Sequence, residues 1–206
     1  MTSNDQEHWT HVYEGKAPTE VSWYQASPEP SLRALSRFGA HPSSAFIDVG
    51  GGASNLVDAL LEQGWQDITV LDIAAPALEA AKSRIGPMAD RVHWEVADIT
   101  EWTPARKFDV WHDRAVFHFL TEPKQHVAYR QALLKGLAAG ALAIVATFAL
   151  DGPERCSGLP VRRYDPASLA DALGESLQLI DAWREVHVTP WGAKQAFNWC
   201  AFRRVG

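Results

Sequence analysis

Acidic residues follow four apolar runs of the sequence, each at or just beyond the point where the run ends. They are Asp48, Asp72, Asp98 and Asp113, and the glycines Gly50–Gly52 come directly after the first run. Glycines allow a tight turn and a close approach of the backbone to a ligand, and the helix that follows offers free N–H groups to a carboxylate. Asp72 could accept hydrogen bonds from both hydroxyls of a ribose, and Asp98 could accept one from an adenine amino group. The sequence therefore predicts a site for an adenosine-containing ligand.

A parallel sheet would bring these residues together, and the hydrophobic pattern predicts one. Strands are expected at residues 45–49, 68–71, 92–96, 108–111, 141–150, 177–188 and 195–202, and helices at 56–61, 76–85, 122–137 and 165–173. Strands that alternate with amphipathic helices indicate right-handed βαβ units in a parallel sheet. Ligands of such sheets bind beyond the carboxyl ends of the strands. The short, turn-rich link at 189–192 favours an antiparallel hairpin between the last two strands.

Three short motifs in this order resemble those of the class I methyltransferases. The segment FIDVGGGAS at 46–54 resembles their first motif, LDIA at 71–74 their second, and ADIT at 97–100 their third. The resemblance covers about 45–150, and the terminal hairpin fits it. It implies an α/β, Rossmann-like, seven-stranded and mostly parallel sheet with helices on both faces and an antiparallel C-terminal hairpin.

The same resemblance implies a cofactor and the residues around it. The cofactor is S-adenosyl-L-methionine (SAM), and the product is S-adenosyl-L-homocysteine (SAH). Ile73 and Ile99 could enclose the adenine ring. The expected cofactor-binding set from this part of the chain is Asp48, Gly50, Gly51, Gly52, Asp72, Ile73, Asp98, Ile99 and His112.

A nicotinamide-binding domain is the alternative reading of the glycine turn. Its fingerprint requires a third glycine at the position that Asn55 occupies here. The nearby carboxylate of Asp48 would also repel a phosphate, whereas the positively charged methionine end of SAM tolerates this carboxylate. The pattern therefore favours SAM.

We expect one domain over residues 1–206, with a lead-in at 1–40, a cofactor-binding core at 45–150, and a substrate loop with the terminal hairpin at 151–206. The lead-in, with Trp23 and Tyr24, is similar to the N-terminal segment of the small thiopurine, tellurite-resistance and protein-lysine methyltransferases. In those families it covers the cofactor as a lid. Flat aromatic faces attract a cation such as a sulfonium. The alternative is that both side chains only fill the helix layer.

The end of the fourth strand carries candidate catalytic residues. His112, Asp113 and His118 could orient or deprotonate a nucleophile, since histidine acts as a base near neutral pH. Alternatively, His112 only lines the cofactor pocket and Asp113 pairs with Arg114. Many enzymes of this class need no base and rely on placing the nucleophile in line with the methyl group.

Cys156 and Arg162 lie in the loop after the fifth strand and are candidate substrate contacts. Arginines close to Cys156 would lower its thiol pKa and favour a thiolate, or could hold an anionic substrate. The alternative is a solvated loop with an inert thiol. We expect no metal site, because no cluster of side chains has ligand spacing.

The bulk composition narrows the possible partners. The net charge is −6, with no long basic run, which disfavours nucleic acid. Two widely spaced cysteines are typical of a reducing, cytoplasmic setting. The longest apolar stretch, at 138–150, is too short to cross a bilayer, and the first residues lack the pattern of a signal peptide.

These observations lead to one functional hypothesis and two rivals. The chain is expected to transfer a methyl group from SAM to a small-molecule acceptor by in-line displacement. The first rival is a protein-lysine N-methyltransferase, although the sequence at 113–117 departs from the pattern of those families. The second rival is a SAM-binding protein without catalysis. The sequence leaves the oligomeric state open.

Overall fold

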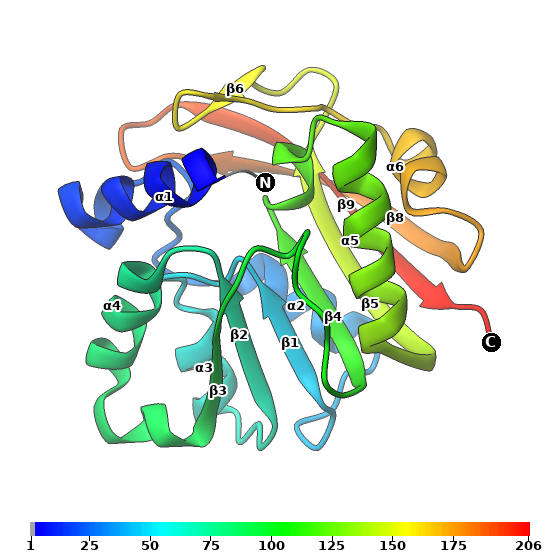
Figure 1. The fold of residues 1–206 in the computed structure, drawn as a ribbon, viewed down its shortest axis with the longest axis horizontal. Helices are drawn as coiled ribbons and strands as arrows, with labels where there is room; N and C mark the ends of the chain where they lie inside the picture. Colours follow the sequence, from blue (N-terminus) through cyan, green and yellow to red (C-terminus); the bar gives the residue numbers. More distant parts are fainter. Residues whose placement is uncertain (1–2) are drawn as a thin grey trace.

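The apolar runs form one seven-stranded sheet in the computed structural model, which describes residues 3–206 (Figure 1). The strands are β1 (Phe46–Val49), β2 (Ile68–Asp72), β3 (Val92–Val96), β4 (Phe108–Arg114), β5 (Leu137–Phe148), β8 (Leu177–Val188) and β9 (Lys194–Arg204). Their order across the sheet is β3-β2-β1-β4-β5-β9-β8. The first five pair in parallel, and β9 is antiparallel to both of its neighbours. The predicted fold class is confirmed.

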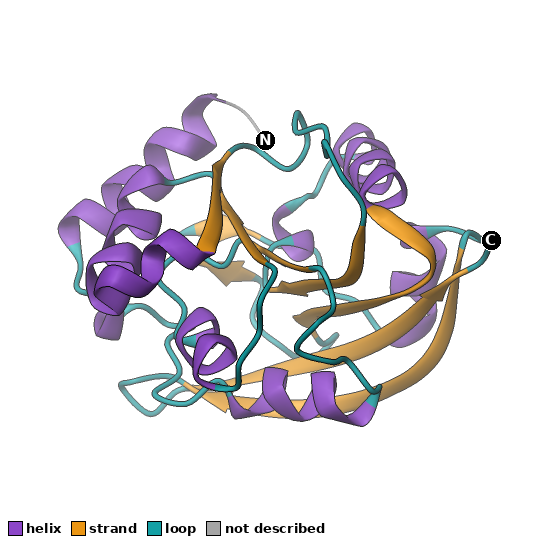
Figure 2. Cartoon of the chain, turned by 90° about the horizontal axis from the view of Figure 1, so that it is seen from below, coloured by secondary structure: helices purple, strands orange, loops and turns teal. Residues whose placement is uncertain are grey.

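Helices cover both faces of this sheet (Figure 2). They are α1 (Ser3–Gly15), α2 (Glu29–Arg37), α3 (Leu56–Glu62), α4 (Ala75–Ile85), α5 (Pro123–Gly136) and α6 (Pro166–Leu173). Short 3-10 turns are η1 (Pro18–Glu20), η2 (Gly86–Arg91) and η3 (Phe117–Phe119). Asp165 caps α6 as the sequence predicts, because its side chain accepts a hydrogen bond from the Ser168 N–H at 2.8 Å.

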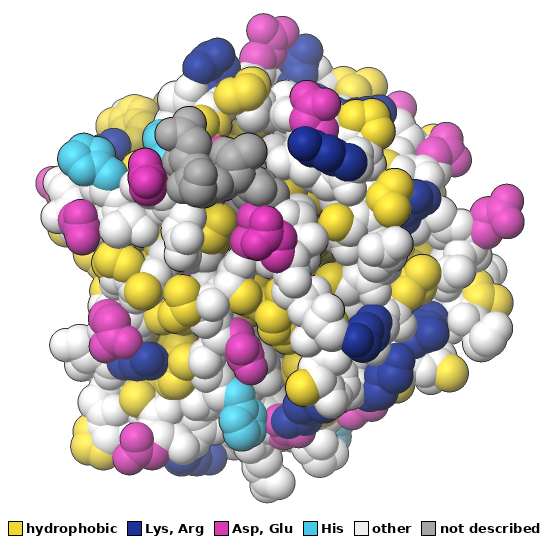
Figure 3. All heavy atoms as spheres, viewed as in Figure 1, with side chains coloured by type: hydrophobic (Ala, Val, Ile, Leu, Met, Phe, Trp, Pro, Cys, Tyr) yellow, Lys and Arg dark blue, Asp and Glu magenta, His cyan; other side chains and the backbone are white. Residues whose placement is uncertain are grey.

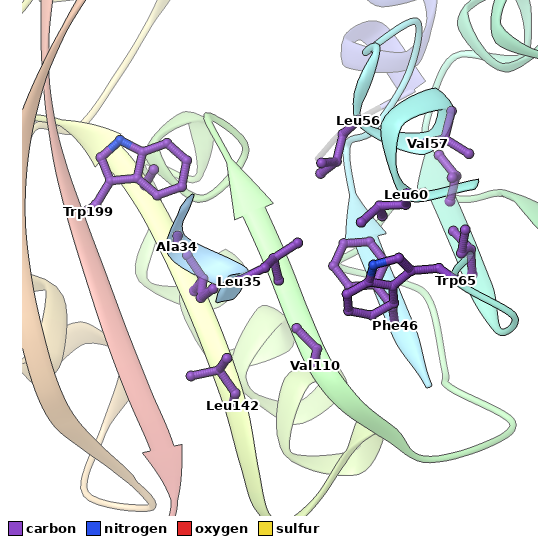
Figure 4. Close-up of a cluster of buried hydrophobic side chains, with 14 of the residues drawn as sticks. Ala34, Leu35, Phe46, Leu56, Val57, Leu60, Trp65, Val110, Leu142 and Trp199 are labelled. Atoms are coloured by element: carbon purple, nitrogen blue, oxygen red, sulfur yellow. The ribbon is translucent and has the colours of Figure 1, made fainter. Parts of the chain in front are cut away.

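The alternation of side chains along each strand divides the core in two. In β1, Phe46 packs with Leu35 of α2 and the apolar side of α3, whereas the next residue, Ile47, packs with Leu133 of α5. This is the two-residue period of a strand buried on both faces. Figure 4 shows the first of these layers, in which Phe46 lies against Trp65 and the α3 side chains.

The lead-in forms α1, η1 and α2, and α1 lies beyond the upper edge of the sheet beside α4 (Figure 1). Trp9 and Val12 of α1 pack on Ala74 and Ala77 at the start of α4. Residues 1–2 of the expected lead-in, 1–40, lie outside the described residues. The lead-in is thus held against the edge at which the parallel strands end.

Two elements differ from the sequence prediction. Strand β5 begins at Leu137, four residues earlier than expected, because Leu137 already pairs with Phe108 of β4 directly after α5 ends at Gly136. Gly140, expected to end the helix, instead has a φ of 72° at an irregular register between β4 and β5. The expected polar loop at 151–164 contains a small hairpin, β6 (Arg155–Cys156) and β7 (Leu159–Pro160).

Candidate active site

Two adjoining cavities lie beyond the carboxyl ends of the parallel strands, next to the point between β1 and β4 where the strand order reverses. We call the larger, of about 700 Å³, the main cleft, and the other, of about 590 Å³, the side cleft. The main cleft is lined by Trp9, Tyr13, Trp23, Val49, Gly50, Leu71, Asp72, Ile73, Ala97, Ile99, Arg114, Ala115, Val116, Phe119, Phe148, Cys156, Gln195 and Phe197. Tyr13, Trp23, Gly50 and Arg114 line both cavities. The two therefore form one continuous candidate site.

The glycine turn after β1 is required by space as well as by backbone conformation. Gly50 has a φ of 69°, and a Cβ there would lie 2.0 Å from Cγ2 of Val116. At Gly51 a Cβ would lie 2.7 Å from Oδ2 of Asp48. A side chain at either position would therefore push the turn away from the cleft, where the backbone now forms the floor.

Asp72 presents a nearly buried carboxylate to the main cleft. Its side chain is 6% exposed, and its Oδ1 accepts a hydrogen bond from the Ala74 N–H at 2.8 Å. Burial, together with the nearby charge of Asp48, raises the pKa of Asp72 to about 7, although backbone hydrogen bonds to this carboxylate act in the opposite direction. Hydroxyl donors from a ligand would favour the ionised form of this carboxylate.

The two residues expected to enclose an adenine lie just after β2 and β3, in the main cleft, whereas Asp98 lines neither cavity. Ile73 and Ile99 both line the main cleft, as does Ala97, which precedes Asp98. The Oδ1 of Asp98 accepts hydrogen bonds from the backbone and side chain of Thr100, at 2.8 and 2.7 Å. Asp98 thus shapes the turn beside the cleft.

Aromatic side chains of the lead-in roof the main cleft. Trp9 contacts Trp23 and Phe119 edge to face, with ring centroids 5.5 and 5.0 Å apart. The Trp23 indole N–H donates to the Tyr13 hydroxyl at 3.2 Å, whereas Tyr24 lines the side cleft. The sequence motif had singled out Trp23 and Tyr24 as contacts. The structure adds Trp9 and Tyr13 to these cleft-lining residues, because both lie on the face of α1 that packs over the main cleft.

His112 sits in a chain of three buried polar side chains. Its Nδ1 lies 2.7 Å from Oδ1 of Asp48, and its Nε2 lies 3.0 Å from Oγ of Ser31 on α2. A carboxylate can only accept, so Nδ1–H donates to Asp48 and a neutral ring accepts the Ser31 O–H at Nε2. Both ring nitrogens are therefore occupied. All three residues line the side cleft, and the chain fixes α2 against the sheet.

Asp113 points to the opposite side of β4 from His112, as strand alternation requires. It is fully buried, and it accepts hydrogen bonds from the Tyr129 hydroxyl at 2.7 Å and the Val116 N–H at 2.9 Å. Burial raises the pKa of Asp113 to about 6. With these partners, Asp113 holds the turn that follows β4, and among residues 3–206 it forms no ion pair with Arg114.

His118 lies behind the wall of the main cleft. Its side chain is fully buried against Phe119 and Phe148, with ring centroids 4.6 and 4.5 Å away. Its Nδ1 accepts the Phe148 N–H at 3.2 Å. Burial and the positive charge of Arg114 lower the pKa of His118 to about 3, so the ring is neutral near pH 7.

Arg114 is a site residue that the sequence reasoning did not select. Its Nη1 donates to the Trp23 carbonyl at 3.2 Å, and its guanidinium lies 4.9 Å from the centre of the Phe197 ring. Its Nε and Nη2 are buried and have no hydrogen-bond partner among the described residues. Burial lowers its pKa. A basic residue directly beyond a strand end was the available signal.

The two substrate candidates of the last third of the chain separate in space. Cys156, 5% exposed, lines the main cleft, and its Sγ lies 3.8 Å from Oγ of Ser22. Burial raises the pKa of the Cys156 thiol to about 11, so it is a neutral thiol near pH 7. Arg162 is exposed and lies over the Tyr164 ring, 5.3 Å from its centre, outside the lining of either cavity.

Comparison with known proteins supports the resemblance that the motifs indicate. Residues 46–135 match the family model described as a methyltransferase domain. A curated relative, malonyl-[acyl-carrier protein] O-methyltransferase of Anoxybacillus flavithermus, is 33% identical over 90 residues. That match covers 43% of this chain, and the chain spans about a third (34%) of the length of that relative.

Solved structures of similar fold extend over nearly the whole chain. One comes from a study of the conversion of a disulfide bond into a thioacetal group during echinomycin biosynthesis. It has a TM-score of 0.79 and 22% identity, and the match covers 98% of this chain and 93% of that one. Another is the 1,6-didemethyltoxoflavin-N1-methyltransferase of Burkholderia thailandensis, solved with its substrate and SAH. Its TM-score is 0.70 at 19% identity, with 98% and 85% of the two chains covered. At these identities the structures show a shared fold.

Proposed function

We propose that this chain, which has the motifs, the matching domain segment and the fold of class I methyltransferases, transfers a methyl group from SAM to a small-molecule acceptor. One observation carries the proposal. A single cleft joins the glycine turn and the carboxylate of Asp72 to a second end lined by Phe148, Cys156 and Phe197. The cleft thus offers binding surfaces for a donor at one end and for an acceptor at the other.

The residues present fit SAM. Asp72 is buried at the wall of the main cleft and would accept the ribose hydroxyls, while Ile73 and Ile99 would enclose the adenine. The turn at Gly50–Gly52 would face the methionine part, and Gly50 lines both cavities with its backbone, because a Cβ there would collide with Val116. The faces of Trp23 and Tyr24 would lie near the positive sulfonium. We propose that residues 1–40 act as the lid.

When bound, SAM supplies an electrophilic methyl carbon, which bonds to the acceptor's lone pair as the C–S electrons return to sulfur and leave SAH. The chain's own contribution is to hold the acceptor in line and to exclude water with the Trp9 and Trp23 roof. His112 has both ring nitrogens in hydrogen bonds, and Asp113 faces the other side of β4. We therefore propose that His112 and Asp113 position the elements around the cleft and do not act as bases. A proton that the acceptor loses would go to solvent.

The lining of the acceptor end favours a small molecule over a protein. Apolar walls are formed by Phe119, Phe148 and Phe197. A protein-lysine methyltransferase would need an acidic groove for the lysine side chain, and the described residues form none at this end of the cleft.

Both cysteines are free and buried, which fits a reducing, cytoplasmic setting. None of the described helices is long and apolar enough to cross a membrane.

A labelled-methyl experiment tests the proposed function. The protein is incubated with methyl-labelled SAM and either a small-molecule extract or an extract of proteins. We expect label in the small-molecule fraction with one SAH formed per methyl transferred, and loss of both with Asp72→Ala. Label confined to proteins would move the acceptor class to the first rival. SAH binding without any transfer in either extract would favour the non-catalytic rival.

A further inference from the structure

The guanidinium of Arg114 has a free edge inside the protein. Nη1 is held by the Trp23 carbonyl at 3.2 Å, whereas Nε and Nη2 are buried without a partner among residues 3–206. These two nitrogens share one edge of the planar group and point their N–H bonds in parallel. That is the edge that binds a carboxylate through two hydrogen bonds.

The nearby carboxylates of Glu185 and Asp48 act on the charge of Arg114 but form no hydrogen bond with it in the described chain, because other donors engage them. Glu185 accepts hydrogen bonds from the Trp199 indole at 2.6 Å and the Gln25 amide at 3.2 Å. Asp48 is engaged by His112. A buried charge that lacks a paired anion is costly, so an arrangement that keeps one in a cleft points to an anion supplied by a ligand.

The surroundings of this edge define the rest of the ligand. The guanidinium stacks on Phe197, whose ring contacts that of Phe148 edge to face at 4.8 Å. Cys156, a neutral thiol, lies in the same part of the main cleft. The amide oxygen of Gln195 there is a second buried atom without a partner in the described chain. Flat apolar walls beside a single anion site suit a planar ring that carries a carboxylate.

We propose that Arg114 is the specificity residue for the acceptor, and that the acceptor is an aromatic or conjugated carboxylic acid. Its carboxylate pairs with Nε and Nη2, and its ring lies against the apolar wall that Phe148 and Phe197 form together. The proposal rests on the proposed function. A carboxylate could also come from the amino-acid part of SAM. We assign the edge to the acceptor because the guanidinium lies against the ring of Phe197, which together with Phe148 and Cys156 forms the acceptor end of the main cleft.

Binding of matched acids and amides to the SAH-loaded protein tests this assignment. The probes are benzoate and 2-naphthoate, each compared with its uncharged amide, in calorimetric or ligand-observed NMR titrations. We expect at least one acid to bind tenfold or more tightly than its amide. Arg114→Met, which keeps the length of the side chain, should remove that preference. Arg114→Lys should restore only part of it, because an ammonium lacks the two-pronged edge.

Arg184→Met is the matched control, since Arg184 is an exposed residue paired with Asp151 at 2.8 Å. It removes the same charge and should leave the preference for acids unchanged. Thermal unfolding of each variant checks the fold. Equal affinity of every acid and its amide for the wild type, including no binding by any of them, would overturn the proposal.

A second comparison separates the two sources of carboxylate. SAH carries the amino-acid carboxylate, and 5′-deoxy-5′-methylthioadenosine lacks it. We expect Arg114→Met to change the affinity for either compound by less than twofold. A tenfold loss for SAH alone would assign the edge to the cofactor and overturn the proposal. If the wild type bound neither compound, the proposed function would fail, while the acid and amide titrations on the protein alone would still report on Arg114.

Discussion

At the residue scale, the end of β4 places side chains both beside the cavities and in the core. His112 and Arg114 point to the side of the cavities, and Asp113, between them, points into the opposite core layer. The sequence identified His112 and Asp113 as chemically capable, but only alternation and packing decide which of them a ligand can meet. The residue that it passed over, Arg114, has the unpaired buried nitrogens.

The first residue-scale prediction concerns Asp72. Its pKa of about 7 means that a proton must leave before ribose hydroxyls can donate to both oxygens. SAH affinity should therefore rise with pH, by about tenfold between pH 6 and pH 8, since the ionised fraction of a group with this pKa rises from roughly one eleventh to roughly ten elevenths over that range. Calorimetry across this range measures the effect. Asp72→Asn should bind weakly with a flat profile, and a flat wild-type profile would contradict the assignment.

The second residue-scale prediction concerns the hydrogen bond from Tyr129 to Asp113. Tyr129→Phe removes a donor from a fully buried carboxylate, which typically costs ~1–3 kcal/mol. The hydroxyl favours the ionised form of Asp113, whose pKa is about 6. The loss of unfolding free energy should therefore be larger at pH 8 than at pH 5, as measured by urea denaturation. In an Asp113→Asn background this pH dependence should vanish; its persistence there would place its origin elsewhere.

At the element scale, α1 is attached to the rest of the chain through few side chains. Trp9 and Val12 pack on α4, and Trp9 and Tyr13 meet Trp23 above the main cleft. Because this contact is small, α1 is expected to open more easily than the sheet. A bound ligand would lie under the same aromatic side chains and add contacts to them.

Hydrogen exchange tests this element directly. SAH should slow exchange of the α1 amides tenfold or more, while amides of β8, remote from the adenosine end, should change little. Trp9→Ala should raise the exchange rate of α1 in the free protein and reduce the protection by SAH. If SAH left α1 exchange unchanged but protected Gly50–Gly52, the cofactor would bind without engaging the lid.

The elements also show where sequence reasoning succeeded and where it could not. Each parallel strand and its following helix were predicted within a few residues, because hydrophobic period and turn residues are local signals. The start of β5 was misplaced by four residues, since the pairing of Leu137 with Phe108 of β4 is a contact between distant segments. The roof of α1 depends likewise on packing against α4.

At the scale of the whole molecule, the topology places the donor and acceptor ends of the cleft on different parts of the sheet. Asp72, Ile73 and Ile99 come from β2, β3 and the segments after them, while Phe148 and Phe197 come from β5 and β9. Acidic and basic side chains are scattered over the face drawn in Figure 3, and hydrophobic ones gather toward its centre. The chemistry is thus concentrated at one edge, where the parallel strands end.

Calorimetric titration of SAH into the wild type and Asp72→Ala most directly tests whether this edge holds the proposed methyl donor. We expect micromolar affinity that falls tenfold or more in the variant, about 1.4 kcal/mol or above. Asp67→Ala, a surface residue paired with Arg106, should bind as the wild type does. Absence of SAH binding to the wild type, with binding of a nicotinamide dinucleotide in its place, would contradict the methyltransferase assignment.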